Sequence, residues 1–121
     1  DIQWIHSHGG GVLPFIYSRF TRQEAALKDR AKVLPNGVSY EVKRFYYDTA
    51  QAFNPYTLAT LKKLIPSSHI LFGTDFPLGG GPISDVAKGL IDSGEFSAAE
   101  LRGIDRENAL QLLPRLKASA P

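Results

Sequence analysis

The chain has 121 residues, enough for one domain, and its 43% hydrophobic and 21% charged content is typical of a globular protein rather than a disordered one. The net charge of +2 is too small to indicate nucleic-acid binding, and the absence of cysteine excludes disulfides and thiolate sites. No apolar run approaches the roughly 20 residues of a membrane span. These features fit a cytoplasmic protein, and we expect neither nucleic acid nor membrane as a partner.

The sequence pattern predicts strands that alternate with helices. Apolar residues with period two indicate strands, and clusters of Gly, Pro, Asn and Ser indicate turns. In chain order we expect strands over residues 2–8, 45–48 and 69–72, with helical segments over 12–32, 55–65 and 82–91 and two more helices near the C-terminus. Alternating strand and helix units favour a parallel sheet with right-handed crossovers, and therefore an α/β fold.

Side chains that cap helix N-termini mark several expected boundaries. Ser97 and Glu100 have the spacing of a capping box, so we expect a helix to begin there. Thr21 and Glu24 have the same spacing, which allows the first helical segment to be two helices. Asp105 is expected to cap the last helix.

An acidic residue follows the third predicted strand. Residues 70–72 are apolar, which is typical of a strand buried on both faces. Parallel sheets place their functional residues just beyond the carboxyl ends of the strands, where Asp75 lies. A carboxylate in a dry environment is costly unless something uses its charge. We therefore interpret Asp75 as a metal ligand or proton carrier, with capping of the turn before Pro77 as the alternative.

His8 follows the first predicted strand and precedes three glycines. An imidazole there can be a general base or a metal ligand, and the simpler interpretation is a loop cap. His6 lies two residues earlier, and a His-x-His pair on a strand can bind metal, although His6 can equally pack in the core. Asp48 ends the second strand, and we expect it to hydrogen-bond beside a metal rather than to bind it. These residues suggest a metal site at one edge of the sheet.

Two further features allow other functions. Glycines at positions 9–11 before a helix could bind phosphate, but the sequence matches neither the dinucleotide fingerprint nor the P-loop. The basic residues of segment 19–32 are typical of a solvated helix face, and a single arginine among them could bind a substrate carboxylate.

Four motifs, in order along nearly the whole chain, resemble the amidohydrolase superfamily. More narrowly, they are similar to the branch around aminocarboxymuconate-semialdehyde decarboxylase, with its related decarboxylases, hydratases and hydrolases. The motifs are His8-Gly9-Gly10-Gly11 with Leu13-Pro14-Phe15, Phe45-Tyr46-Tyr47-Asp48-Thr49-Ala50, Phe72-Gly73-Thr74-Asp75-Phe76-Pro77 and Glu107-Asn108-Ala109. The resemblance implies a (β/α)₈ TIM barrel with a divalent metal, most often zinc, at the C-terminal face of its strands.

The resemblance also implies roles for single residues. Residues 1–114 would contain strands six to eight of the barrel with their helices, and residues 115–121 would form a tail. His8 matches the active-site histidine that handles protons, and Asp75 matches the metal-binding aspartate after strand eight. Arg19 stands where family decarboxylases carry an arginine that binds a carboxylate in the neighbouring subunit's site. His6 matches no functional position.

The family's other metal ligands have no counterpart in this sequence. A barrel takes about 250 residues, and a catalytic zinc site usually has three protein ligands. We therefore expect the 121 residues to be a fragment of a longer enzyme or one part of an assembly, and to bind metal weakly alone. Open sheet edges predict self-association, either as a homo-oligomer or with the remainder of the barrel.

The predicted function is that of a metal-dependent hydrolase or carboxy-lyase. A metal-activated water, or the metal itself, would promote decarboxylation, hydration or hydrolysis of a small carboxylated substrate, with the isolated chain inactive. The alternative is a non-catalytic structural or interaction module derived from such a barrel.

Overall fold

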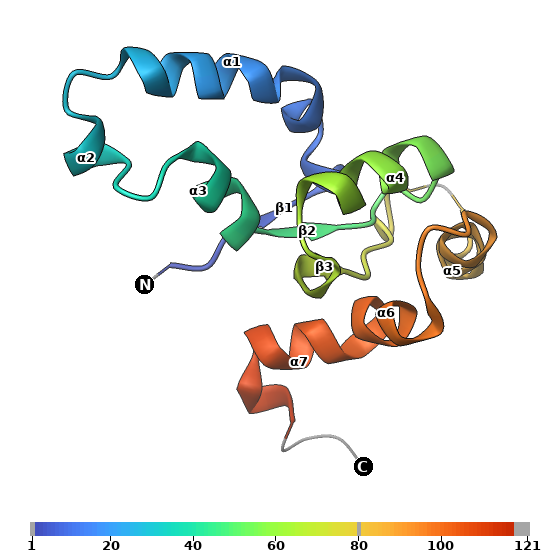
Figure 1. Ribbon diagram of the computed structural model, residues 1–121. Helices are drawn as coiled ribbons and strands as arrows, with labels where there is room; N and C mark the ends of the chain where they lie inside the picture. Colours follow the sequence, from blue (N-terminus) through green and yellow to red (C-terminus); the bar gives the residue numbers. More distant parts are fainter. Residues whose placement is uncertain (1, 80, 118–121) are drawn as a thin grey trace.

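The computed structural model describes residues 2–79 and 81–117, so Gly80 and residues 118–121 of the predicted tail lie outside the described residues. Short strands alternate with helices along the chain (Figure 1). The elements are β1 (Ile5–His6), η1 (His8–Gly10), α1 (Leu13–Ala26), α2 (Arg30–Val33), α3 (Val38–Arg44), β2 (Tyr46–Asp48), α4 (Pro55–Leu64), η2 (Ser67–His69), β3 (Ile70–Leu71), α5 (Ile83–Asp92), α6 (Ala98–Arg102), the π-helical turn η3 (Gly103–Glu107), α7 (Asn108–Leu112) and η4 (Pro114–Leu116).

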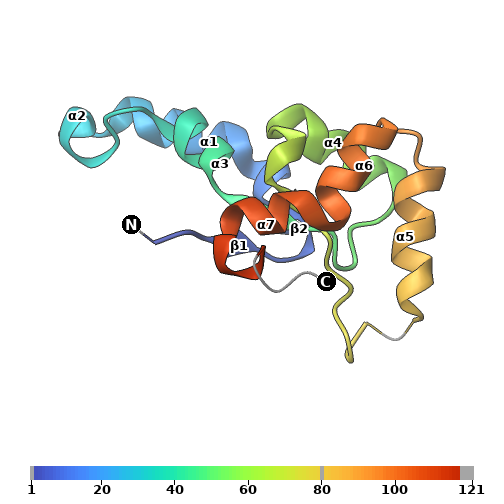
Figure 2. The same cartoon turned by 90° about the horizontal axis from the view of Figure 1, so that it is seen from below.

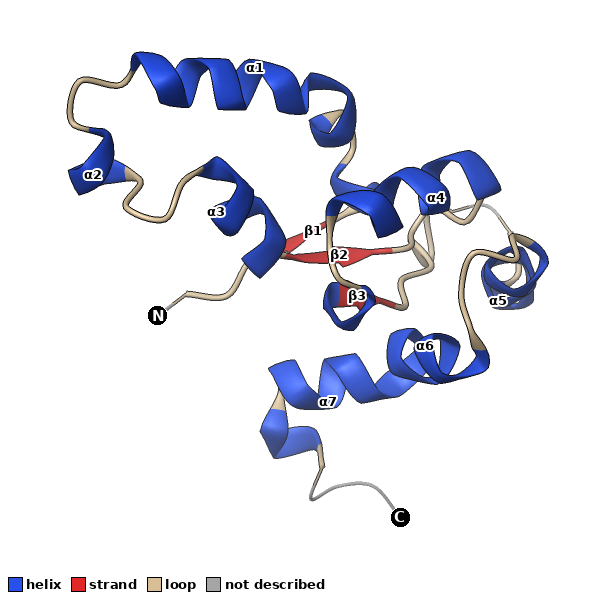
Figure 3. Ribbon diagram, viewed as in Figure 1, coloured by secondary structure: helices blue, strands red, loops and turns tan. Residues whose placement is uncertain are grey.

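The three strands form one parallel sheet in the order β1-β2-β3. His6 pairs with Tyr47, and Tyr47 pairs with Ile70, so the strands are in register across the sheet. This confirms the predicted parallel α/β arrangement. The strands are shorter than the pattern predicted, and loops occupy much of the remaining length (Figure 3).

The hydrophobic core lies between the sheet and the helices around it. Helix α7 packs beside β3, whereas α1 packs against α3 and α4. Figure 2 shows α6 and α7 in front of the strands. The largest fully buried side chains are Tyr47, Leu58, Leu61, Ile70, Ile104 and Thr49. Among the described residues, no helix has the length and apolar character needed to cross a membrane.

Two predicted helix boundaries are wrong. Segment 12–32 does contain two helices, α1 and α2, but α1 continues through Thr21 to Ala26, and the Thr21 hydroxyl donates to the Ser18 carbonyl (3.1 Å) instead of capping a new helix. Glu24 instead accepts a hydrogen bond from the Val38 amide (3.0 Å), which ties α1 to the start of α3. Asp105 lies inside the π-helical turn that joins α6 to α7, so it caps nothing. Capping spacing also occurs within helices, and the sequence alone cannot separate the two cases.

The glycine turn after β1 packs directly against the central strand. Gly10 has a φ of +81°, and a Cβ atom there would lie 2.8 Å from the Tyr47 ring. Tyr47 cannot easily move, because it is fully buried and its hydroxyl donates to the Val42 carbonyl (2.8 Å). Burial also raises the pKa of Tyr47 to about 12. The turn therefore needs glycine for both its conformation and its close contact.

We expect Gly10→Ala to lower the free energy of unfolding by about 2–4 kcal/mol, because alanine is strained at positive φ and its methyl group overlaps Tyr47. Gly94→Ala is the control, since Gly94 has a φ of +67° but a Cβ atom there would meet no neighbouring group within 4 Å. Urea unfolding of both variants measures the difference. Equal losses would show that the contact with Tyr47 contributes nothing.

A salt bridge between Lys62 of α4 and Glu100 of α6 connects the two helices. The Lys62 ammonium lies 3.1 Å from Glu100 Oε2, and the Ser97 amide donates to the same oxygen (2.9 Å). The Ser97 and Glu100 side chains form the predicted capping box. The Ser97 amide, followed by the Lys62 ammonium, lowers the pKa of the Glu100 carboxyl to about 2.

A lowered pKa means that the unfolded chain binds this proton more readily than the folded chain. The stabilisation from Glu100 is therefore complete above the unfolded pKa, near 4.5, and is lost as the pH falls towards about 2. We expect Glu100→Gln to reduce stability at neutral pH and to flatten the loss of stability between pH 4.5 and 2. Chemical unfolding measured between pH 2 and 7 tests this prediction, with Glu107→Gln at an exposed position as the control. A Glu100→Gln profile parallel to that of the unmodified chain would contradict the prediction.

Candidate metal centre at the carboxyl ends of the strands

The same backbone conformation follows each of the three strands. His8, Gln51 and Asp75 have φ values of +56°, +54° and +60°, and they are the positive-φ residues other than glycine in the described chain. Each such residue costs about 1–3 kcal/mol, so the surrounding structure must hold it in place. Because the strands are parallel, the three residues lie at one edge of the sheet. The structure thus brings His8 and Asp75 to the same edge, as the sequence predicted.

The hydrogen bonds of His8 determine which ring nitrogen is free. Its Nδ1 lies 3.1 Å from the Ala50 carbonyl oxygen, and its backbone amide donates to Asp48 Oδ1 (2.8 Å). A carbonyl oxygen only accepts hydrogen bonds, so Nδ1 is the donor here, and in the neutral ring Nε2 carries the lone pair. The ring is exposed. Nε2 is therefore available to take up a proton or to bind a cation.

Asp48 holds the loops after β1 and β2 together. Its Oδ1 accepts from the His8 amide and from the Ala50 amide (3.1 Å). Its close approach to β3 requires Gly73, where a Cβ atom would lie 2.8 Å from Asp48 Cβ. Asp48 thus contacts the backbone of His8, and its predicted role beside a metal stays a prediction.

Asp75 has one carboxylate oxygen without a hydrogen bond to the described residues. Oδ2 accepts from Gln51 Nε2 (3.2 Å), and the Asp75 carbonyl accepts from the Gly79 amide (2.7 Å). The side chain is partly buried. Among the described residues, neither Asp75 nor Asp48 belongs to a salt bridge. The edge therefore carries two carboxylates that no cationic side chain of this part of the chain neutralises.

Thr49 and Gln51 also shape this edge, and the sequence reasoning missed both. The buried Thr49 hydroxyl donates to the Gly73 carbonyl and accepts from the Gly73 amide, both at 3.0 Å. This pair of bonds fixes the end of β2 against the end of β3. The signal for Gln51 is its backbone conformation, which a single sequence does not reveal.

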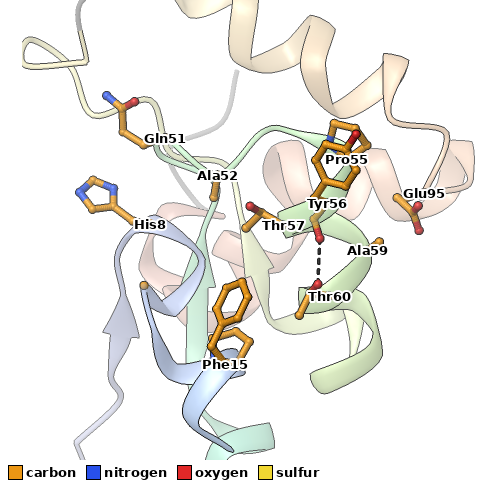
Figure 4. A pocket seen from close by; sticks show the side chains of 12 residues that line it. His8, Phe15, Gln51, Ala52, Pro55, Tyr56, Thr57, Ala59, Thr60 and Glu95 are labelled. Atoms are coloured by element: carbon orange, nitrogen blue, oxygen red, sulfur yellow. Dashed lines mark hydrogen bonds between the residues drawn. The ribbon is translucent and has the colours of Figure 1, made fainter.

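A hollow of about 660 Å³ begins at His8 and Gln51 and runs between the start of α1 and helix α4 (Figure 4). The exposed rings of Phe15 and Tyr56 contribute to its lining, as do polar side chains such as Thr57. Apolar and aromatic walls with a few polar groups are typical of small-molecule sites. The hollow is thus continuous with the candidate centre.

The structure places two other histidine and arginine candidates away from this centre. His6 and His8 do not share a strand face, because β1 ends at His6. The His6 ring instead packs 4.9 Å from Phe45 and 5.4 Å from Tyr47, measured between ring centroids. A His-x-His metal pair is therefore wrong. Arg19 lies on the exposed surface of α1 and does not line the hollow.

The glycine turn is a poor phosphate site. The His8 amide is bonded to Asp48, the Gly10 amide donates to the Ser7 carbonyl (3.0 Å), and the Gly11 amide donates to the His8 carbonyl (3.0 Å). A phosphate would need free amides and would meet the Asp48 carboxylate. The geometry disfavours the phosphate interpretation.

The described residues fit part of a divalent-cation site. Carboxylate oxygen and imidazole nitrogen are suitable ligands, and Asp75 and His8 each have such an atom free. Within residues 2–79 and 81–117, however, no three His, Cys, Asp or Glu side chains are grouped to hold a metal ion. Asp75 could supply one ligand, and further ligands would have to come from other polypeptide.

The family model of the amidohydrolases matches residues 1–115. The chain belongs to the amidohydrolase family. This confirms the resemblance drawn from the four motifs. Among curated relatives, the 6-methylsalicylic acid decarboxylase of Aspergillus aculeatus is 37% identical over 120 residues, which cover 93% of this chain and 36% of that protein. The 6-methylsalicylic acid decarboxylase of Penicillium expansum is 31% identical over 115 residues, covering 93% of this chain and 35% of that protein.

A solved structure of this family also resembles the chain. Dihydroxybenzoic acid decarboxylase from Polaromonas sp. JS666, with bound manganese and the inhibitor 2-nitroresorcinol, matches with a TM-score of 0.74 and 27% identity. The match covers 91% of this chain and 33% of that one. This amidohydrolase chain therefore spans about a third of the length of the curated relatives it matches.

We expect Asp48→Ala to lower the free energy of unfolding by about 2 kcal/mol, because two backbone amides lose a charged acceptor. Hydrogen exchange of the His8 amide should accelerate in the same variant. Asp105→Ala is the control, since Asp105 is exposed and forms no hydrogen bond through its side chain with the described residues. Unchanged exchange at His8 would show that Asp48 does not hold this loop.

Proposed function

We propose that this chain forms one part, with strands β1 to β3, of a metal-dependent (β/α)₈ amidohydrolase that decarboxylates a small carboxylated aromatic compound. The observation that carries the proposal is that an imidazole Nε2 and a carboxylate oxygen, neither with a hydrogen-bond partner among the described residues, lie at one edge of the sheet. The relatives support the substrate class, since their names specify decarboxylases of aromatic acids.

Asp75 would hold a divalent metal. Manganese is present in one related structure, whereas zinc was expected from the motifs, and either ion accepts carboxylate and imidazole ligands. When bound, such an ion stabilises negative charge on the substrate and lowers the pKa of water. Gln51 donates to Asp75 Oδ2, which leaves Oδ1 for the ion.

His8 would move the proton. Decarboxylation breaks the bond between the ring carbon and the carboxylate, releases CO₂ and leaves an electron pair that must take up a proton at the same carbon. With Nδ1 fixed by the Ala50 carbonyl, His8 has only Nε2 with which to accept or deliver this proton. Asp48 would keep the ring in place through the His8 amide.

Arg19 would bind the substrate carboxylate of a neighbouring subunit, as the resemblance implies. Its position on an exposed helix face, away from the hollow, suits contact with a second chain better than contact with its own site. An arginine binds a carboxylate through two parallel hydrogen bonds. This role requires a homo-oligomer.

The remaining strands and metal ligands would come from polypeptide beyond these 121 residues, as the partial coverage of the relatives suggests. We call the resulting assembly the complete enzyme. The isolated chain is expected to bind metal weakly and to be inactive. The alternative is a non-catalytic structural or interaction module derived from such a barrel.

We expect Asp75→Ala in the complete enzyme to lower kcat/KM for 6-methylsalicylate or a dihydroxybenzoate by about 10³-fold or more, because Mn²⁺ loses a ligand. Removal of the metal with a chelator should cause a similar loss that Mn²⁺ reverses. Asp105→Ala is the control and should keep normal turnover. Normal turnover by Asp75→Ala would remove this residue from the mechanism, and a complete assembly without metal binding or turnover would favour the interaction module.

A further inference from the structure

Gln51 connects the two loops that carry the candidate chemistry. Its Nε2 donates to Asp75 Oδ2 (3.2 Å) and lies 3.4 Å from the Gly79 carbonyl oxygen. Both partners only accept hydrogen bonds, so the amide nitrogen, not the amide oxygen, must face them. Gln51 also lines the hollow beside His8 (Figure 4). One side chain therefore reaches from the end of β2 to the loop after β3.

The backbone beneath Gln51 is rigidly held. Thr49, Ala50 and Ala52 are buried, with 0%, 3% and 2% of their surface exposed, whereas Gln51 is exposed. The Ala50 amide donates to Asp48 Oδ1, and the Ala52 amide donates to the Thr49 carbonyl (3.0 Å). The turn adopts a φ of +54° at Gln51, which glycine would adopt without strain. A glutamine in this conformation needs other contacts to hold it, and its side chain forms two.

The loop from Asp75 to Gly79 forms a tight turn, and Gln51 bonds to both of its ends. The Gly79 amide donates to the Asp75 carbonyl (2.7 Å), so the two partners of Gln51 are the two ends of one turn. By bonding to both ends, Gln51 orients the carboxylate and the turn that bears it. Carboxylates that bind metals usually accept a hydrogen bond on their other side, and losing it weakens metal binding by about 10–100-fold.

We infer that Gln51 is a positioning residue that fixes the Asp75 carboxylate as a cation ligand, an inference that rests on the proposed function. A neutral amide suits this role, because it holds one carboxylate oxygen without adding a positive charge that would compete with the ion. A shorter or apolar side chain cannot bridge Asp75 and Gly79.

Two variants separate positioning from a purely structural role. Gln51→Met keeps the length of the side chain but removes the donor. Gln51→Gly removes the side chain and relieves the strain of the positive φ, so its Tm should not fall. Gln23→Met on the exposed face of α1 is the matched control. In the complete enzyme, Mn²⁺ affinity is measured by counting free Mn²⁺ with electron paramagnetic resonance.

We expect both Gln51 variants to bind Mn²⁺ about 10–100-fold more weakly than the parent, while Gln23→Met binds it normally and Gln51→Gly keeps its Tm. Parent-like Mn²⁺ affinity in both Gln51 variants would overturn the inference. A fall in Tm for Gln51→Gly with unchanged affinity would likewise assign Gln51 a structural role only.

A parent enzyme that binds neither Mn²⁺ nor Zn²⁺ would refute the proposed function, and a second measurement then decides the role of Gln51. Deuterium exchange of residues 74–79 should be about tenfold faster in Gln51→Met than in the parent if Gln51 orders this loop. Equal exchange rates would overturn the inference independently of any metal.

Discussion

The two hydrogen bonds between the Thr49 hydroxyl and the backbone of Gly73 hold the candidate centre together. Both are 3.0 Å long and lie where β2 and β3 end, at a threonine with no exposed surface. Hydrogen bonds shielded from water are electrostatically stronger than those exposed to it. Asp48 lies directly before Thr49, and Asp75 lies two residues after Gly73. The separation of the two carboxylates is therefore set by a contact in the interior, not by the exposed loops.

The same principle explains why residues other than glycine occupy strained backbone at the three strand ends. The positive φ of His8, Gln51 and Asp75 turns the chain sharply out of the sheet, and bonds to neighbouring loops hold each turn in place. His8 is held by Asp48 at the end of β2, and Asp75 is held by Gln51 in the loop after β2. The central strand of the sheet thus organises the site. Strained backbone conformations that several surrounding hydrogen bonds hold in place are common at functional sites.

The sequence was sufficient to predict the parallel sheet and the edge at which His8 and Asp75 lie. Alternating apolar residues in strands and glycines in turns are local signals that a single sequence contains. It was insufficient for Gln51 and Thr49, whose importance depends on contacts with residues 24 to 28 positions away. It also misplaced Thr21 and Asp105 as helix caps, since the continuous helices there are decided by packing rather than by spacing. Site residues with tertiary partners are thus the ones that a single sequence conceals.

The distribution of charge at this edge explains why a cation fits it better than a phosphate. The Asp48 charge is shared with two backbone amides, and those amides are then no longer available to an anion. Among the described residues, the Asp75 carboxylate accepts a hydrogen bond from the neutral Gln51 amide, which stabilises the charge less than a salt bridge would. A carboxylate with no cationic side chain among the described residues beside it favours a positive partner over an anion. The three strands therefore hold a carboxylate and an imidazole in fixed positions, whereas the other ligands that the proposed metal needs would have to come from outside the described residues.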